Sequence, residues 1–281
     1  MQESVTGTHA TGISRLAYYM SGATHENLLI VLHGITNNSL AQSRIAQEMN
    51  SQWRVMLVDG LGHGLSARFT AEDAEHPLEA AASEVVALIR QFSPAQRHFK
   101  TVVVAHSWGG ALAGRVAAQV PELIDAMVLE DPAWLNEEWL AYFRTELPKE
   151  IEHFERIRQD PEKELAQTRR DNPEWPVDEM IGWLQGKCLV DAGMLRLGVA
   201  GDPRGVEAAR HISVPTLIVS GDGDSIIVGP EGLQRIEEMH NPALTTALLP
   251  GASHAIRRDQ PEQFYALVKE YLRSVLASEE E

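Results

Sequence analysis

Ser107 is the side chain with the clearest potential for chemistry in this sequence. It follows the apolar, β-branched run 101–105 and precedes Trp108, two glycines and a stretch of small residues. This pattern predicts a strand, a sharp turn and a helix, with the serine hydroxyl exposed at the apex of the turn. The positive end of the helix dipole would point at the same place. A serine held in this way is a candidate nucleophile, which needs a base, an acid and an oxyanion site.

A histidine and two aspartates follow later apolar runs. His254 lies in a Pro/Gly-bearing loop just after run 244–249, and Asp222 and Asp224 follow run 216–219. The carboxyl edge of an open α/β sheet is where ligands bind, so these side chains are expected near Ser107. A histidine can shuttle a proton near neutral pH, and a carboxylate can orient its ring. The residues alone leave both aspartates open as the acid.

A fourth segment could supply the oxyanion site. His33-Gly34-Ile35 follows the apolar run 28–32. The backbone N–H of Ile35 and that of Trp108 could together hold the oxyanion of a tetrahedral intermediate. Gly34 permits the close backbone approach that this needs. We expect His33 to hold the loop by hydrogen bonds rather than to act as a second base.

Elements that could position these residues follow from the hydrophobic pattern. Apolar runs without polar alternation suit strands buried on both faces of a parallel sheet, and helical spacing separates them. This rhythm predicts a doubly wound α/β core. The alternation of strands and helices stops at 133–212, a segment rich in charged residues that contains four of the six tryptophans. Its prolines, including Pro148, should divide it into several short helices. The expected strands are 28–32, 55–58, 101–105, 126–129, 216–219 and 244–249, and the expected helices are 40–50, 78–92, 110–120, 230–239 and 261–276.

Composition limits the possible partners. The chain has 281 residues and a formal charge of −16, which argues against nucleic acid and anionic membrane surfaces as partners. Its first residues lack the basic start and apolar stretch of a signal peptide, and Cys188 is the single cysteine, so we expect a cytoplasmic protein. The glycines at 60, 62 and 64 do not complete a dinucleotide fingerprint, because Leu65 stands where the third glycine should be. We therefore expect a small-molecule substrate with no cofactor and no metal, and leave the oligomeric state open.

The motifs together resemble those of a known family. They are His33-Gly34, the run 59–66, Ala105-His-Ser107-Trp-Gly109, Gly221-x-x-Asp224 and Gly251-Ala-Ser-His254. In this order they resemble the α/β-hydrolase family with a Ser-Asp-His triad, which includes esterases, lactonases, C–C bond hydrolases and cofactor-free haloperoxidases. The family pattern Gly-x-x-Asp selects Asp224 over Asp222. In some relatives the acid comes instead from the end of the strand after the elbow, where Glu130 and Asp131 stand. Ala105 departs from the family, which has a glycine there.

The resemblance implies a capped serine hydrolase. A core made of 1–132 and 213–281 would carry the triad Ser107, Asp224 and His254, and a helical cap at 133–212 would cover it and set substrate choice. We expect cleavage of a carboxylic ester or lactone of a small, uncharged and moderately apolar molecule through an acyl-enzyme. The same triad could instead serve C–C hydrolysis, perhydrolysis or a lyase reaction, or the chain could be a small-molecule receptor. The residues expected to line the substrate pocket are Gly34, Trp134, Trp183, Ile256 and the indole of Trp108.

Overall fold

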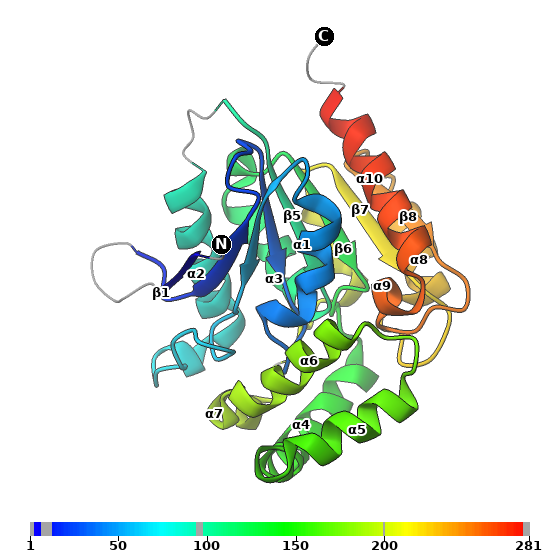
Figure 1. Cartoon of the computed structure of the whole chain (residues 1–281). Helices are drawn as coiled ribbons and strands as arrows, with labels where there is room; N and C mark the ends of the chain where they lie inside the picture. Colours follow the sequence, from blue (N-terminus) through cyan, green and yellow to red (C-terminus); the bar gives the residue numbers. More distant parts are fainter. Residues whose placement is uncertain (1–2, 7–12, 94–97, 199, 278–281) are drawn as a thin grey trace.

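The computed structural model describes residues 3–6, 13–93, 98–198 and 200–277. An eight-stranded sheet in the order β1-β2-β4-β3-β5-β6-β7-β8 forms its centre (Figure 1). The strands β4, β3, β5, β6, β7 and β8 run parallel, whereas β2 pairs antiparallel with both β1 and β4. This is the mostly parallel, doubly wound sheet expected from the sequence. The strands are β1 (Glu3–Thr6), β2 (Ala17–Ser21), β3 (Leu28–Leu32), β4 (Arg54–Val58), β5 (Thr101–His106), β6 (Ala126–Glu130), β7 (Thr216–Ser220) and β8 (Leu244–Leu248).

Burial explains which strands the sequence revealed. Every residue of β3, β5, β6 and β7 is buried, so these strands read as continuous apolar runs. All six expected strands form, with ends within one residue of the expectation. The two antiparallel strands β1 and β2 at one edge of the sheet were not expected, because their short, partly polar sequences lack such a run.

Helices cover both faces of the sheet. Apolar side chains of α2, α3 and α8 pack in one hydrophobic cluster, and those of α1 and α10 in the other. The expected helix at 40–50 is divided, because Asn38 caps a 3₁₀ turn at Ser39–Gln42 before α1 starts. The helices outside the segment between β6 and β7 are α1 (Ser43–Met49), α2 (Pro77–Phe92), α3 (Trp108–Gln119), α8 (Gly229–Glu237), α9 (Ile256–Asp259) and α10 (Pro261–Ala277).

The segment between β6 and β7 is helical and lies beyond the carboxyl ends of the parallel strands (Figure 1). Its one extended pairing among the described residues is an isolated bridge between Trp134 and Asp202. Pro148 does not divide it as expected but lies inside the long helix α4, whereas Pro161 begins α5 and Pro176 precedes α6. Its elements are α4 (Glu137–Gln159), α5 (Pro161–Asp171), α6 (Val177–Leu189), α7 (Ala192–Leu197) and the 3₁₀ helix Gly205–His211. We call residues 133–212 the insertion.

Two glycines let the insertion approach the core closely. A Cβ atom at Gly182 would lie 2.4 Å from the backbone N of Ala41, and one at Gly186 would lie 2.9 Å from Cα of Asn37. Because these glycines are four residues apart in α6, they form one flat face that rests on the loop after β3. Across the described ranges, no helix is both long and apolar enough to cross a membrane.

Candidate active site

Ser107 stands on a strained turn between β5 and α3. Its φ of 54° and ψ of −118° are unfavourable for a residue with a Cβ, as is usual where a nucleophile is held up at the end of a strand. The following glycines make the turn possible. A Cβ at Gly109 would lie 2.6 Å from the carbonyl oxygen of Leu32, and one at Gly110 would lie 2.8 Å from Cβ of Pro132. The turn forms with Ala105 as a buried residue of β5.

His254 is held by a buried carboxylate. Its Nδ1 lies 2.5 Å from Oδ2 of Asp131, the residue directly after β6. The same carboxylate accepts the Ser220 hydroxyl at 2.8 Å and the backbone N–H groups of Ile227 and Val228 at 2.9 and 3.0 Å. These donors stabilise a fixed negative charge at the end of the imidazole ring. With Nδ1–H donated to Asp131, Nε2 is the nitrogen left to act as a base.

This geometry overturns the assignment of Asp224 as the acid. Asp224 is exposed, and its backbone carbonyl, rather than its carboxylate, accepts the N–H of His254 at 3.2 Å. Asp222 accepts the N–H of Gly251 at 2.6 Å and so holds the turn before the histidine. Neighbouring strands β6 and β7 end at the same edge, so a motif alone could not distinguish their loops. Asp131 was the open alternative, and the chain order of serine, aspartate and histidine is unchanged.

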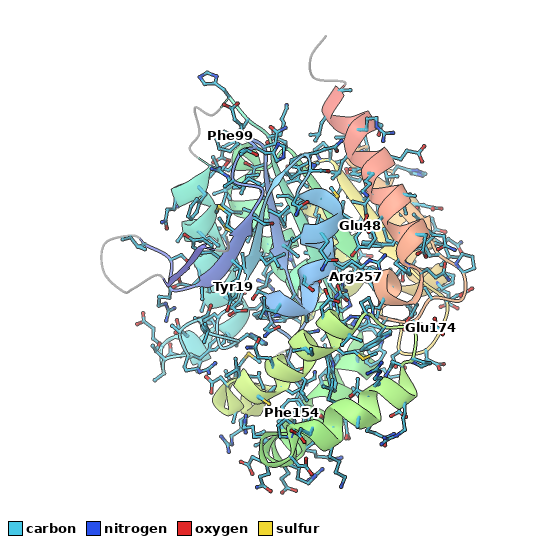
Figure 2. All side chains as sticks on the ribbon, in the orientation of Figure 1. Tyr19, Glu48, Phe99, Phe154, Glu174 and Arg257 are labelled. Atoms are coloured by element: carbon cyan, nitrogen blue, oxygen red, sulfur yellow. The ribbon has the colours of Figure 1, made fainter. Side chains whose placement is uncertain are left out.

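The second alternative, Glu130, has a structural partner. Glu130 and Arg257 form a buried ion pair at 2.9 Å, and Glu179 of α6 pairs with Arg258 at 2.8 Å. Two buried acids thus balance two buried arginines from α9. Figure 2 shows Arg257 where the core meets the insertion. The four side chains join these parts and leave Glu130 unavailable to His254.

A cavity of about 410 Å³ connects the serine with the histidine. The structure places Gly34 and Trp183 in its wall, together with Ser107 and His254. It does not place Ile256 there, because that side chain is fully buried in the core beneath, and Ala255 lines the wall instead. The remaining lining residues are Ile35, Asn37, His106, Phe143, Trp175, Lys187, Asp224, Ser225, Ser253 and Arg258.

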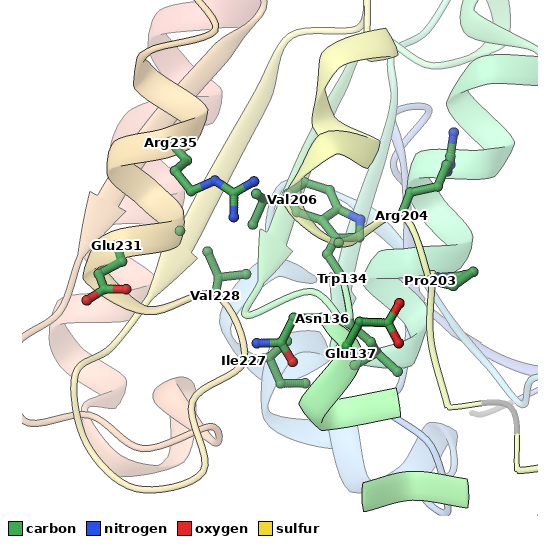
Figure 3. A pocket seen from close by; sticks show the side chains of 13 residues that line it. Trp134, Asn136, Glu137, Pro203, Arg204, Val206, Ile227, Val228, Glu231 and Arg235 are labelled. Atoms are coloured by element: carbon green, nitrogen blue, oxygen red, sulfur yellow. The ribbon is translucent and has the colours of Figure 1, made fainter. Parts of the chain in front are cut away.

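Two tryptophans expected in the substrate pocket lie elsewhere. Trp134 lines a separate pocket of about 350 Å³ with Arg204, Glu231 and Arg235 (Figure 3). The indole of Trp108 packs in the core, where its ring centroid lies 5.0 Å from that of His63. A tryptophan is large enough to line a pocket or to join two layers, and the sequence pattern did not separate these roles.

The candidate oxyanion donors are the amides of Ile35 and Trp108. Ile35 lines the cavity, and Trp108 is the first residue of α3, whose N–H has no intrahelical acceptor. In the described ranges, neither amide donates a hydrogen bond to another group. Neither amide is thus committed to an acceptor within these ranges, as an oxyanion site requires.

Two buried histidines fix the loop that carries Ile35. His33 donates from Nδ1 to the Gly34 carbonyl at 2.8 Å and accepts the N–H of Gly60 at Nε2 at 2.9 Å. His63 accepts the N–H of Thr36 at 3.1 Å. Burial lowers the pKa of both rings, so both are neutral and keep these donor and acceptor roles. His33 therefore has the loop-holding contacts expected of it.

His106 is a site residue that sequence reasoning missed. Its Nε2–H donates to the backbone carbonyl of His254 at 2.9 Å, and the two ring centroids lie 4.7 Å apart. Burial lowers its pKa well below the usual value, which keeps the ring neutral. Nothing in the sequence except its place before Ser107 pointed to this contact.

Lys187 is the second residue that was missed. It projects from α6 into the cavity wall, where its Nζ donates to Oγ1 of Thr36 and lies 5.1 and 5.3 Å from the ring centroids of Trp183 and Phe154. Burial lowers its pKa to about 7. The expectation of an uncharged substrate took no account of two cations that line the cavity: Lys187, which α6 brings to the site, and Arg258, which lies four residues after His254. The spacing of Gly182 and Gly186 marks the face of α6 that approaches the core but does not by itself give the direction of Lys187.

Comparison with known proteins identifies the family. Residues 29–267 match the model of the alpha/beta hydrolase family. The chain belongs to this family. It is 27% identical over 249 residues to 2-(acetamidomethylene)succinate hydrolase of Mesorhizobium japonicum, covering 84% of each protein. It is 26% identical over 263 residues to the pimeloyl-[acyl-carrier protein] methyl ester esterase of Aeromonas salmonicida, covering 87% of this chain and 94% of the esterase.

A solved structure confirms the fold. The crystal structure of E-2-(acetamidomethylene)succinate hydrolase superposes with a TM-score of 0.74 at 20% identity, over 97% of this chain and 99% of that one. The family expected from the motifs is therefore confirmed, and relatives that are hydrolases support hydrolase activity for this alpha/beta hydrolase. Over the ranges that the structure describes, no three His, Cys, Asp or Glu side chains gather into a group that could ligate a metal ion.

Proposed function

We propose that this alpha/beta hydrolase is a serine hydrolase that cleaves a carboxylic ester or lactone of a small molecule through an acyl-enzyme. The observation that carries the proposal is the hydrogen bond of 2.5 Å between His254 Nδ1 and Asp131, in a cavity that also exposes the strained Ser107. In this proposal residues 133–212 form a cap on a core made of 1–132 and 213–281. The curated relative named as a methyl ester esterase supports an ester as substrate.

Each step follows from the groups in the cavity. Nε2 of His254 takes the hydroxyl proton of Ser107 while Oγ attacks the carbonyl carbon. The amides of Ile35 and Trp108 donate to the oxyanion that forms. As the carbonyl re-forms, the bond to the leaving oxygen breaks and His254 gives it the proton. Water, deprotonated by the same histidine, then attacks the acyl-enzyme and releases the acid with Ser107 restored. Asp131 stabilises the imidazolium in both halves.

Ser107 and His254 could also serve other functions, which the experiment below distinguishes from ester hydrolysis. The relatives include an ester hydrolase and a hydrolase of 2-(acetamidomethylene)succinate. Their names favour hydrolysis as the reaction but leave the type of bond that is cleaved open. C–C hydrolysis, perhydrolysis and a lyase reaction would use the same serine and histidine. A receptor would bind a small molecule in the same cavity without turning it over.

The test combines labelling with turnover. A fluorophosphonate should phosphonylate Ser107, located by mass spectrometry of the tryptic peptide, and a panel of 4-nitrophenyl esters, lactones and vinylogous diketones should identify the bond that is cleaved. Ser107→Ala should lose both labelling and turnover. Ser225→Ala is the matched control, because Ser225 lines the same cavity but does not stand on the elbow, and it should keep the label. Wild-type protein that neither labels nor turns over any member of the panel contradicts the proposal.

A further inference from the structure

The wall that the insertion contributes to the cavity contains one cation whose place needs explanation. The ammonium of Lys187 lies 5.1 and 5.3 Å from the ring centroids of Trp183 and Phe154, and Thr36 provides its hydrogen-bond acceptor. No carboxylate lies within ion-pair distance of Lys187 in the described part of the chain. Holding an ammonium group in such surroundings is costly, and in proteins such groups are usually paired.

The neighbouring charges do not supply a partner. Glu179 and Glu130 are engaged by Arg258 and Arg257. Glu150 of α4 and Glu164 of α5 attract the ammonium over a longer range, whereas Arg258 repels it. No carboxylate of the described residues therefore neutralises the ammonium of Lys187 on the side that faces the cavity.

We propose that Lys187 binds a carboxylate of the substrate, so that the enzyme acts on small anionic acyl compounds rather than neutral ones. This inference rests on the proposed function for its turnover, but its binding step stands without it. A bound carboxylate would pair with the ammonium and favour its charged form.

The position of Lys187 restricts where that carboxylate lies. Gly186 brings α6 against the loop after β3, and the ammonium donates to Thr36, the residue after Ile35. The backbone of Thr36 has a φ of 61°, a conformation held by the bond from its N–H to His63. The carboxylate site thus adjoins the candidate oxyanion site, and a short molecule can reach both.

A second polar group faces the same wall. Asn37 lines the cavity and is 6% exposed, and its buried Oδ1 has no hydrogen-bond partner among the residues that the structure describes. Phe143 and Trp183 provide apolar surface on the insertion side. The ligand class that fits is a short-chain dicarboxylate monoester, or a lactone that carries a carboxylate.

The first experiment measures binding without turnover. The Ser107→Ala protein is titrated with succinate and with glutarate by calorimetry at pH 6.5, alone and combined with Lys187→Met. We expect Lys187→Met to weaken dicarboxylate binding at least about 10-fold. Lys149→Met is the matched control, since Lys149 is an exposed lysine of the insertion paired with Glu146, and it should bind as the parent does. Equal affinity with and without Lys187, or no binding of either acid, overturns the inference.

The second experiment separates this inference from the proposed function. Mono-4-nitrophenyl glutarate and its methyl ester differ in one charge, and their kcat/KM values are compared after subtraction of spontaneous hydrolysis. Lys187→Met should lower the ratio of anionic to neutral kcat/KM about 10- to 100-fold, and Lys187→Arg should restore part of it. An equal loss for both esters would assign Lys187 to the oxyanion and contradict carboxylate binding. A protein that binds glutarate through Lys187 but is not labelled at Ser107 contradicts only the proposed function.

Discussion

The two sides of the proposed active-site cavity are built in opposite ways. The core wall consists of the lining residues of the core and the buried groups directly behind them: Asp131 accepts four hydrogen bonds, and His33, His63 and His106 are neutral rings that form hydrogen bonds with backbone groups. On the insertion side, the wall consists of aromatic side chains and Lys187, which lacks an acidic partner in the described part of the chain. The groups proposed to react are thus held by hydrogen bonds, many of them to the backbone, whereas the groups proposed to recognise the substrate project from packed helices. Variants of the core wall should impair every substrate, and variants of the insertion wall should discriminate between substrates.

The largest effect should come from the acid of the core wall. Asp131→Asn should lower kcat about 10³–10⁴-fold, because an amide cannot hold the Nδ1–H tautomer of His254 or stabilise its charged form. Asp224→Asn, the matched change in the neighbouring loop, should alter kcat less than about 3-fold, because its carboxylate is exposed and does not contact the ring. Steady-state kinetics on a neutral 4-nitrophenyl ester measures both.

The reverse ranking of these variants would restore Asp224 as the acid. Asp131→Asn also disturbs the amides of Ile227 and Val228, so circular dichroism and the urea midpoint must show that the protein remains folded. A folded Asp131→Asn protein with nearly full kcat would falsify the assignment of Asp131 as the acid that orients His254.

The sequence predicted the core wall better than the insertion wall for a physical reason. Strands such as β3 and β5 are buried along their whole length, so they can be recognised in the sequence as apolar runs. The residues that follow parallel strands must lie together at the carboxyl edge of the sheet. Hence the sequence alone predicts that Ser107, His254 and the loop with Ile35 lie at the same edge of the sheet. The sequence could not decide between Asp131 and Asp224, because the answer depends on the paths of the two loops that follow the neighbouring strands β6 and β7. Lys187 depended on the rotation and close packing of α6, which helical periodicity does not give.

The loop of the core wall should be sensitive to a single methyl group. A Cβ at Gly34 would lie 2.8 Å from Nδ1 of His106 and 3.1 Å from Cβ of Ser107. Gly34→Ala should therefore push the loop with Ile35 away from the serine and reduce kcat about 10- to 100-fold for charged and neutral esters alike. The parallel loss on the two esters is the measurement that distinguishes this variant from one in the insertion wall. A loss confined to the anionic ester would contradict it.

Because of Lys187 in the insertion wall, kcat/KM for an anionic substrate should depend on pH differently from kcat/KM for a neutral one. Burial lowers the pKa of Lys187 to about 7, so the free enzyme loses this cation as pH rises through that value. The groups facing it are Thr36, Glu150, Glu164, Arg258 and the neutral rings of His33 and His63. We expect kcat/KM for mono-4-nitrophenyl glutarate to fall above about pH 7, whereas its methyl ester lacks that falling limb. Lys187→Arg should abolish the limb, because arginine stays charged. Identical profiles for the two esters would contradict a role of Lys187 in binding the carboxylate.

The smallest effect concerns stability and has the opposite sign to the effect on recognition. A lysine whose pKa is lower folded than unfolded binds fewer protons in the native state, so its contribution to stability rises with pH between about 7 and 10.5. Lys187→Met should therefore increase the free energy of unfolding by about 1–3 kcal/mol at pH 6.5, and by less at pH 9.5. Urea unfolding at both values measures the difference, with Lys149→Met as the exposed control that should show none. Equal destabilisation by Lys187→Met at both pH values would mean that lost packing of the side-chain stem, and not the buried charge, dominates. A gain that fades with pH would instead show that this wall keeps its cation at the expense of stability, as expected of a group retained to bind an anion.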